Sequence, residues 1–155
     1  MSTLVLSSLD DLVRTVAADT SRWQRHVRFD AGARYWHRLA SLPDADLWLL
    51  TWLPEQSTDL HDHGEATAAF IVVEGHLEEV RVRPGGALVR SDVGPGTVRG
   101  VPAGAVHDVA NHGSVPAVSI HAYTPRLTAM TFWEPAPRGL RRLSTVLTDQ
   151  PEVAR

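Results

Sequence analysis

From about residue 33 onward, short apolar runs alternate with turns that contain glycine or proline, and this punctuation limits the folds open to the chain. Breaks such as Pro84-Gly85-Gly86 and Gly94-Pro95-Gly96 are too frequent for long helices. Many short strands at such spacing predict an all-β fold, an antiparallel sandwich or barrel. The expected strands are Tyr35–Leu39, Leu47–Trp52, Ser57–His61, Ala69–Glu74, Leu77–Val82, Ala87–Val93, Thr97–Val101, His107–Asn111, Val115–Tyr123 and Ala129–Trp133.

The N-terminal segment, residues 1–32, predicts helix instead. Apolar residues recur there at helical spacing, and Ser8 followed by Asp11 resembles a capping box with Asp in place of Glu. A second short helix is expected over Ser21 to Val27. The apolar positions of the first helix are Leu9, Leu12, Val13 and Val16.

At 155 residues the chain is expected to form one domain, with a β-barrel over residues 33–134 between the helical segment and a C-terminal tail. The tail, residues 135–155, is rich in proline and arginine at first, and Leu140–Leu147 is compatible with a short helix.

Composition excludes several classes of function. The net charge of −3 is spread without a basic block, so neither nucleic acid nor an anionic membrane is an expected partner. The chain has no cysteine, which rules out disulfides, thiolate ligands and a cysteine nucleophile. Neither a signal peptide nor an apolar stretch of membrane-spanning length is recognisable, so we expect a cytoplasmic protein, a monomer or a weak homo-oligomer.

Two of the eight histidines, His61 and His63, are separated by a single residue. Side chains alternate along a strand, so these imidazoles point the same way, about 7 Å apart along the backbone. A third imidazole from His107 would bind a metal while leaving other positions open, as in catalytic rather than structural sites. Imidazole ligands with open positions suit Fe(II), although Zn, Ni and Cu would also bind.

A second polar row follows later in the sequence. Ser119, His121 and Tyr123 alternate with apolar residues, so one strand face would carry a hydroxyl, an imidazole and a phenol. The row is either part of a site or a polar face open to solvent. The opposite face, with Val118, Ile120 and Ala122, is expected in the core.

These histidines lie in two motifs that resemble those of the cupin superfamily, which implies a jelly-roll-like antiparallel β-barrel. In the first motif Glu55 replaces the leading glycine, and Ala68 stands where the superfamily usually has a glutamate ligand. Three neutral imidazoles would therefore leave a divalent ion its full charge and favour an anionic ligand such as a thiolate. The matching residues are His61, His63 and Gly75 in the first motif and Gly96, Pro102, Gly104, His107 and Asn111 in the second.

More narrowly, the chain is similar to the cysteine dioxygenase family, of the bacterial type. That resemblance implies Fe(II) held by His61, His63 and His107, which binds cysteine through sulfur and amine, and O2 that oxidises the sulfur to a sulfinate. The segments that carry the resemblance are His61–Gly64, Ala69–Gly75, His107–Asn111 and Ser119–Pro125.

The resemblance also implies roles for residues outside the ligand set. Tyr123 matches the family's active-site tyrosine, with Ser119 and His121 as its hydrogen-bonded partners, and the Thr124-Pro125 bond is expected to be cis. Ala68 occupies the position of the cysteine that crosslinks to this tyrosine in vertebrate members, so no such crosslink can form.

Recognition of a substrate carboxylate needs a cation, and an arginine offers a planar fork for it. Arg38 is expected in this role, although a slip of one residue would place His37 there. Trp52 and Phe70 are expected to form apolar pocket walls, a role that core packing would explain nearly as well.

The sequence therefore predicts an Fe(II)-dependent thiol dioxygenase that acts on L-cysteine, with a small thiol and O2 as its partners. Three alternatives stay open: the same chemistry on another thiol such as 3-mercaptopropionate, a non-enzymatic metal-binding cupin, and a metal-dependent isomerase. The last is the weakest, because such isomerases usually keep the glutamate that Ala68 replaces.

Overall fold

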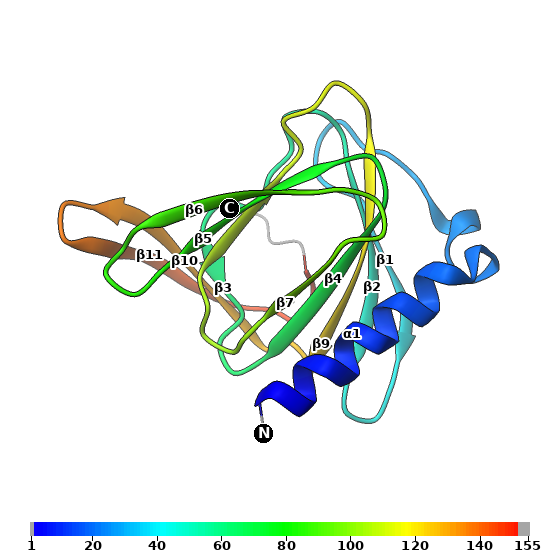
Figure 1. Cartoon of the computed structure of the whole chain (residues 1–155), viewed down its shortest axis with the longest axis horizontal. Coiled ribbons are helices and arrows are strands. Elements are labelled where there is room, and N and C mark those ends of the chain that lie inside the picture. The colour runs from blue at the N-terminus through cyan, green and yellow to red at the C-terminus, as the bar shows by residue number, and fades with distance from the viewer. Residues whose placement is uncertain (1, 152–155) are drawn as a thin grey trace.

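Two antiparallel β-sheets pack face to face, with one helix on the outside (Figure 1). The computed structural model describes residues 2–151, with side chains from residue 8 onward. The five-stranded sheet has the order β1 (Trp36–Ser41), β2 (Asp46–Trp52), β9 (Ala117–Thr124), β4 (Thr67–Glu74), β7 (Val98–Val101). The six-stranded sheet has the order β11 (Gly139–Leu147), β10 (Ala129–Ala136), β3 (His61–Asp62), β8 (His107–Ala110), β5 (Leu77–Val82), β6 (Leu88–Val93). The predicted cupin-type sandwich is confirmed.

The five-stranded sheet is buried on both faces because it has a layer on each side. Along β4, Phe70 and Val72 point between the sheets, whereas Ala69 and Ile71 point outward beneath the helix. The same alternation along β9 sends Tyr123 inward and its neighbour Ala122 outward. The inner face of this sheet is therefore where a site between the two sheets can form.

The helix α1 (Ser2–Ala18) covers the outer face of the five-stranded sheet and runs along β4 and β9 in Figure 1. Leu9, Val13 and Val16 are buried against Ile71 and Ile120 in one apolar cluster. The helical spacing of these residues is thus confirmed, and so is the core role of the outward face of β9. This layer fixes β4 and β9 from behind.

The predicted start of the helix was wrong. The helix begins at Ser2, so Ser8 and Asp11 lie inside it rather than at its cap. The second predicted helix is instead two 3-10 turns, Thr20–Arg22 and Gln24–His26. Asp19 begins the first turn by accepting a hydrogen bond from the Ser21 backbone N–H at 3.2 Å, which favours a tight turn over an α-helix.

Strands occur in every predicted run, but the run Ser57–His61 is mostly irregular. Only His61 of this run belongs to β3, while Ser57 forms an isolated bridge with Ala110. Asp59 has a φ of 62°, in the left-handed region, which interrupts extended pairing just before the first histidine.

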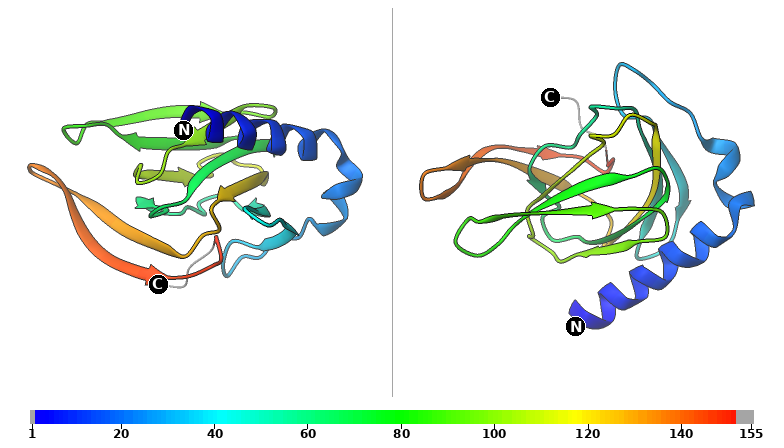
Figure 2. Two further views of the ribbon diagram at one scale, coloured as in Figure 1. Left: turned by 90° about the horizontal axis from the view of Figure 1, so that it is seen from below. Right: turned by 45° about the horizontal axis from the view of Figure 1, so that its top comes forward.

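The predicted helix at Leu140–Leu147 was also wrong, because these residues form β11. β11 pairs with β10 in a hairpin that projects from the body of the molecule (Figure 2), and the hydroxyls of Thr131 and Thr145 hydrogen bond across it at 2.8 Å. Most of β11 is exposed, so its sequence lacks the alternation of apolar and polar residues that is typical of a half-buried strand. Residue 1 and the last part of the predicted tail, 152–155, lie outside the described residues. Within the described part of the chain, no helix is long and apolar enough to cross a membrane.

Candidate metal centre

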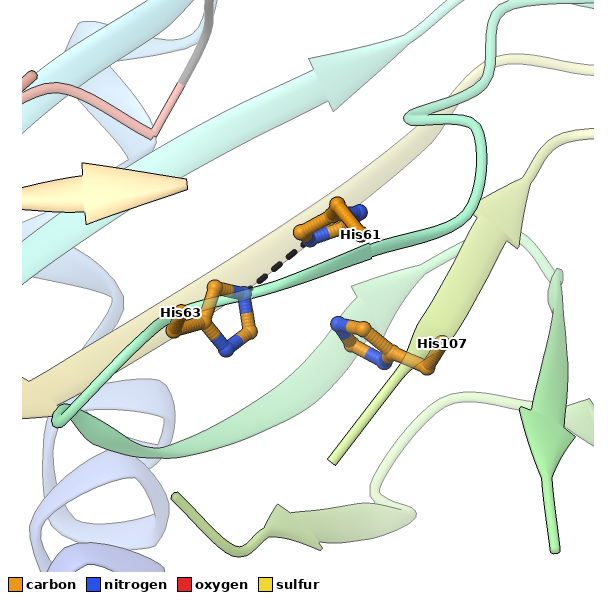
Figure 3. Close-up of side chains that lie close together, drawn as sticks. All are labelled: His61, His63 and His107. Carbon is orange, nitrogen blue, oxygen red and sulfur yellow. Dashed lines mark hydrogen bonds between the residues drawn. The ribbon is translucent and has the colours of Figure 1, made fainter. Parts of the chain in front are cut away.

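Three buried imidazoles converge on the inner face of the six-stranded sheet (Figure 3). His61 opens β3, and His63 follows directly after that strand. His107 opens β8 and is paired directly opposite His61 in the ladder. A two-residue strand and its neighbour thus bring together residues more than forty positions apart.

The spacing of the imidazole nitrogens suits a shared metal ion. The ligand atoms of the three histidines all lie within 4.8 Å of one another, and the Nε2 atoms of His61 and His63 are 3.1 Å apart. Two nitrogens about 2.1 Å from one ion, at angles of roughly 90–109°, would lie roughly 3.0–3.4 Å apart. The separation of the His61 and His63 nitrogens falls in this range, and His107 lies close enough to join them at a metal that keeps other coordination positions open.

Different groups orient the three rings. The Nδ1 atom of His61 lies 2.8 Å from the carbonyl oxygen of Asp59, and the left-handed backbone of Asp59 allows this contact. The Nδ1 atom of His107 lies 2.8 Å from Oε2 of Glu79. Both contacts require a proton on Nδ1, so Nε2 of each ring carries the lone pair that a metal needs. Nδ1 of His63 is buried without a hydrogen-bond partner among residues 2–151.

Asp62, between the two histidines, points away from them and holds their backbone in place. Its carboxylate accepts hydrogen bonds from the Gly64 N–H at 2.9 Å and from Nε1 of Trp133 at 2.9 Å. The acid in the His-x-His pair is thus an anchor on the far face rather than a ligand, as strand alternation requires.

Burial keeps the imidazoles of His61 and His63 uncharged. Desolvation lowers the pKa of each well below 6.5, and the neighbouring histidines lower it further. Neutral rings offer lone pairs, whereas protonated rings would have to lose a proton before they could bind a metal.

Glu79 is a buried carboxylate that the sequence analysis missed. Burial alone would raise the pKa of Glu79, but the hydrogen bond and charge of His107, together with Arg81, outweigh it and lower the pKa. The sequence does contain a signal, because Glu79 lies on the same strand face as Leu77, which is also buried. A carboxylate on the same face as an inward-facing leucine is unusual, and it indicates that a cationic or hydrogen-bonding side chain is buried beside it.

Trp52, Ser119 and His121 form a hydrogen-bonded row on the facing sheet. Nε1 of Trp52 donates to Oγ of Ser119 at 2.8 Å, and Oγ of Ser119 lies 2.7 Å from Nε2 of His121. Tryptophan can only donate, so Oγ of Ser119 accepts from Trp52 and uses its remaining hydrogen-bonding capacity on Nε2 of His121. Burial, followed by the charges of His107 and Arg34, lowers the pKa of His121 to about 3. His121 is therefore neutral.

Tyr123 and Phe70 complete the inner wall opposite the histidines. The ring of Tyr123 meets that of His63 edge-on, with centroids 5.1 Å apart. Phe70 stacks on His121 at 5.0 Å. Burial raises the pKa of Tyr123 above its ordinary value of 10.0, so its phenol keeps its proton. The row Ser119, His121, Tyr123 faces the histidines rather than solvent.

Two arginines near β1 lie in different environments. The side chain of Arg38 is 40% exposed and lies 3.8 Å from Asp46 and 3.9 Å from Asp149, with its guanidinium over the Trp48 ring. Arg34, by contrast, is buried.

The guanidinium of Arg34 lies 5.1 Å from the centre of the Trp52 ring, and its charge lowers the pKa of His61, His121 and Tyr123. Arg34 is thus the cation beside the histidine group. No sequence pattern predicted Arg34 in this place, because a loop rather than strand alternation directs it inward; its position beside Tyr35-Trp36 was the signal that the sequence offered.

The remaining motif residues connect the loops that hold the site. The Gly104 N–H donates to the Gly64 carbonyl at 3.0 Å and so joins the two motifs. The Asn111 amide donates to the carbonyls of Trp52 and Val115, each at 2.9 Å. The predicted cis Thr124-Pro125 bond is confirmed.

Comparison with known proteins identifies the family. The family model for cysteine dioxygenase type I matches residues 6–135. The chain belongs to the cysteine dioxygenase type I family.

Solved structures with the same fold share little sequence with this family member. The protein TT1209 from Thermus thermophilus has a TM-score of 0.59 at 22% identity, over 66% of this chain and 92% of that one. An uncharacterized conserved protein with a double-stranded β-helix domain from Klebsiella pneumoniae subsp. pneumoniae MGH 78578 has a TM-score of 0.59 at 16% identity, over 82% and 88%. A cupin superfamily protein from Desulfitobacterium hafniense DCB-2 has a TM-score of 0.56 at 14% identity, over 66% and 87%. At these identities the structures establish the fold alone.

Membership in the cysteine dioxygenase type I family and the group of three histidines together indicate a metal-dependent thiol dioxygenase, which acts on a small molecule with O2.

Proposed function

We propose that this protein is an Fe(II)-dependent dioxygenase that oxidises L-cysteine to cysteine sulfinate with O2. The observation that carries the proposal is the convergence of three buried imidazoles opposite a buried, protonated tyrosine, in a member of the cysteine dioxygenase type I family. The reaction adds both oxygen atoms of O2 to the thiol sulfur.

His61, His63 and His107 are the proposed metal ligands. When bound, the ion would supply a Lewis-acidic centre at which the thiol loses its proton and sulfur and oxygen are brought together. Imidazole ligands with open positions suit Fe(II), and the family supports this choice over Zn, Ni or Cu. No carboxylate from position 68 offsets the charge of the ion, since Ala68 stands there, and this favours an anionic thiolate.

Arg34 is the proposed carboxylate-binding residue, in place of Arg38. A guanidinium forms two parallel hydrogen bonds with a carboxylate, and burial beside Trp52 strengthens such a pair relative to one in water. Arg38 is more exposed and lies within 4 Å of two carboxylates of the protein, Asp46 and Asp149. The charge of Arg34 at the histidine group supports an amino acid or another small carboxylate as substrate.

Tyr123, His121 and Ser119 are the proposed residues beside the reacting atoms. The phenol of Tyr123 keeps its proton at neutral pH and can donate a hydrogen bond to the oxygen that is transferred. Ser119 holds the neutral imidazole of His121 through Nε2, and Trp52 in turn holds Ser119. With Phe70 stacked on His121, this row is packed and hydrogen-bonded rather than free to rotate.

Thiol-dependent oxygen uptake by the iron-loaded protein tests this proposal. We expect L-cysteine to consume O2 and yield sulfinate in the wild type. Arg34→Gln should raise KM for cysteine by about 10-fold or more, since hydrogen bonds to charged groups contribute about 1.5–3 kcal/mol. Arg38→Gln is the matched control and should stay within about twofold of the wild type.

Each other outcome points to one of the alternatives. Faster oxygen uptake with 3-mercaptopropionate than with cysteine would assign the protein to a different thiol. An iron-loaded protein that consumes no O2 with either thiol would mean a binding protein rather than an enzyme. A KM raised by Arg38→Gln but not by Arg34→Gln would return the carboxylate role to Arg38.

A further inference from the structure

Glu79 combines deep burial with full charge compensation. Its side chain is 1% exposed on β5, yet its carboxylate contacts three cationic or hydrogen-bonding side chains. Oε2 lies 2.8 Å from Nδ1 of His107, and Oε1 lies 3.2 Å from Nε of Arg81 and 3.7 Å from Nε of Arg99. Such a cluster costs desolvation energy, and well-packed apolar residues would stabilise the fold at least as well.

The two arginines are held in place on the far side of the carboxylate. Arg81 donates to the Gly100 carbonyl, and Arg99 donates to the Asp92 carbonyl at 3.3 Å. Arg81 lies on β5 in the six-stranded sheet and Arg99 on β7 in the five-stranded sheet. Glu79 is therefore held by residues of both sheets, and its Oε2 atom faces His107.

This arrangement determines which nitrogen of His107 is free. A carboxylate only accepts hydrogen bonds, so the His107 proton sits on Nδ1, and Nε2 presents its lone pair to His61 and His63. The His107 ring is oriented by a charged group of the described residues, the Glu79 carboxylate. His61 contacts a backbone carbonyl, and Nδ1 of His63 has no hydrogen-bond partner within the described range.

We propose that Glu79 is a positioning residue that fixes the tautomer of His107 and strengthens His107 as a metal donor. Three neutral imidazoles bring no negative charge to a metal ion. Glu79 would supply such charge indirectly, through its hydrogen bond to His107. The inference rests on the proposed role of His107 as a metal ligand. A carboxylate bonded to the distal nitrogen of a ligating histidine raises its basicity, and loss of such a partner costs about 10–100-fold in metal affinity.

The neighbouring residue Glu78 provides a matched control. Its side chain is 26% exposed, and it pairs with Arg90 at 2.9 Å rather than with a proposed ligand. Glu78→Gln and Glu79→Gln make the same chemical change on adjacent positions of one strand, but only the second removes charge from the His107 contact.

The test uses Co(II), whose visible spectrum reports its ligands, titrated into the metal-free protein. We expect Glu79→Gln to bind Co(II) about 10–100-fold more weakly than the wild type with an altered spectrum, and Glu78→Gln to bind within about twofold. Thermal unfolding of the metal-free variants checks that each is folded. Unchanged Co(II) affinity in folded Glu79→Gln would overturn the role of Glu79 and leave the proposed function intact.

A second measurement needs no variant. Nitrogen-15 NMR of the imidazole rings in the metal-free wild type should find the His107 proton on Nδ1, whereas a proton on Nε2 would overturn the proposal even if Glu79→Gln failed to fold. Wild-type protein that binds no Co(II) at all would refute the metal site itself, and Glu79 with it.

Discussion

Acidification should destabilise the metal-free protein steeply, because three buried imidazoles are uncharged in the folded state. Burial lowers the pKa of His61 and His63 well below 6.5 and that of His121 to about 3. In the unfolded chain these rings bind a proton near pH 6.5, so the unfolded state takes up more protons as the pH falls. The free energy of unfolding therefore decreases.

The size of the effect follows from the number of rings. For one histidine that is protonated only when unfolded, the free energy of unfolding falls by about 1.4 kcal/mol between pH 7.5 and 5.5. Three such rings give about 4 kcal/mol, a large share of the roughly 5–15 kcal/mol typical of a domain.

Two carboxyl groups modify this pH dependence at its acidic end. Burial, with the charge of Asp59, raises the pKa of Asp108, so Asp108 takes up its proton earlier in the folded state and offsets part of the loss. The lowered pKa of Glu79 adds to the loss, but only as the pH falls below about 4.5.

The assay is urea unfolding of chelator-treated protein at pH values from 7.5 to 5.5. His121→Gln should remove about one third of the decrease, and His112→Gln, at a side chain that is 56% exposed, is the surface control. A free energy of unfolding that varies by less than about 1 kcal/mol across this range would refute the burial of neutral imidazoles.

Other predictions concern backbone, packing and ligand binding. Gly75→Ala should destabilise the fold by more than about 1 kcal/mol. The φ of Gly75 is 73°, and a Cβ there would lie 2.6 Å from the Pro116 carbonyl oxygen. Gly85→Ala, where φ is also positive but no atom lies near the added Cβ, should cost less in the same urea assay. Ser119→Ala should cost about 2–4 kcal/mol, because it leaves two buried partners without their hydrogen bond, whereas exposed Ser114→Ala should cost nearly nothing by thermal unfolding. A divalent ion at 100 times its Kd should stabilise the protein by about 2.7 kcal/mol, and a chelator should reverse the shift in Tm.

The sequence predicted the sandwich and the histidine group because both depend on local patterns, namely the alternation of side chains along strands and the turn residues between strands. Turn residues bound each strand, and the two-residue period determines that His61 and His63 share a face. The same period correctly separated His121 from Ile120. The second motif succeeded for a further reason: Gly96 and Gly104 have positive φ values that favour glycine, and the Asn111 amide donates hydrogen bonds to loop carbonyls.

Features that depend on tertiary contacts were missed or misassigned. β11 is a strand because it pairs with β10, and its exposed sequence carries no burial pattern. Arg34 faces the site because of a loop conformation that no periodicity encodes. Glu79 becomes informative only once β5 and β8 are known to be neighbours, which brings its carboxylate to His107.

Metal stoichiometry tests the central claim most directly. The metal-free protein would be incubated with Fe(II) under anaerobic conditions, desalted and analysed for bound iron per chain. We predict about one iron per chain in the wild type and almost none in His107→Ala, with both proteins folded by circular dichroism. Wild-type protein without iron, or His107→Ala with a full equivalent, would contradict a site built from His61, His63 and His107.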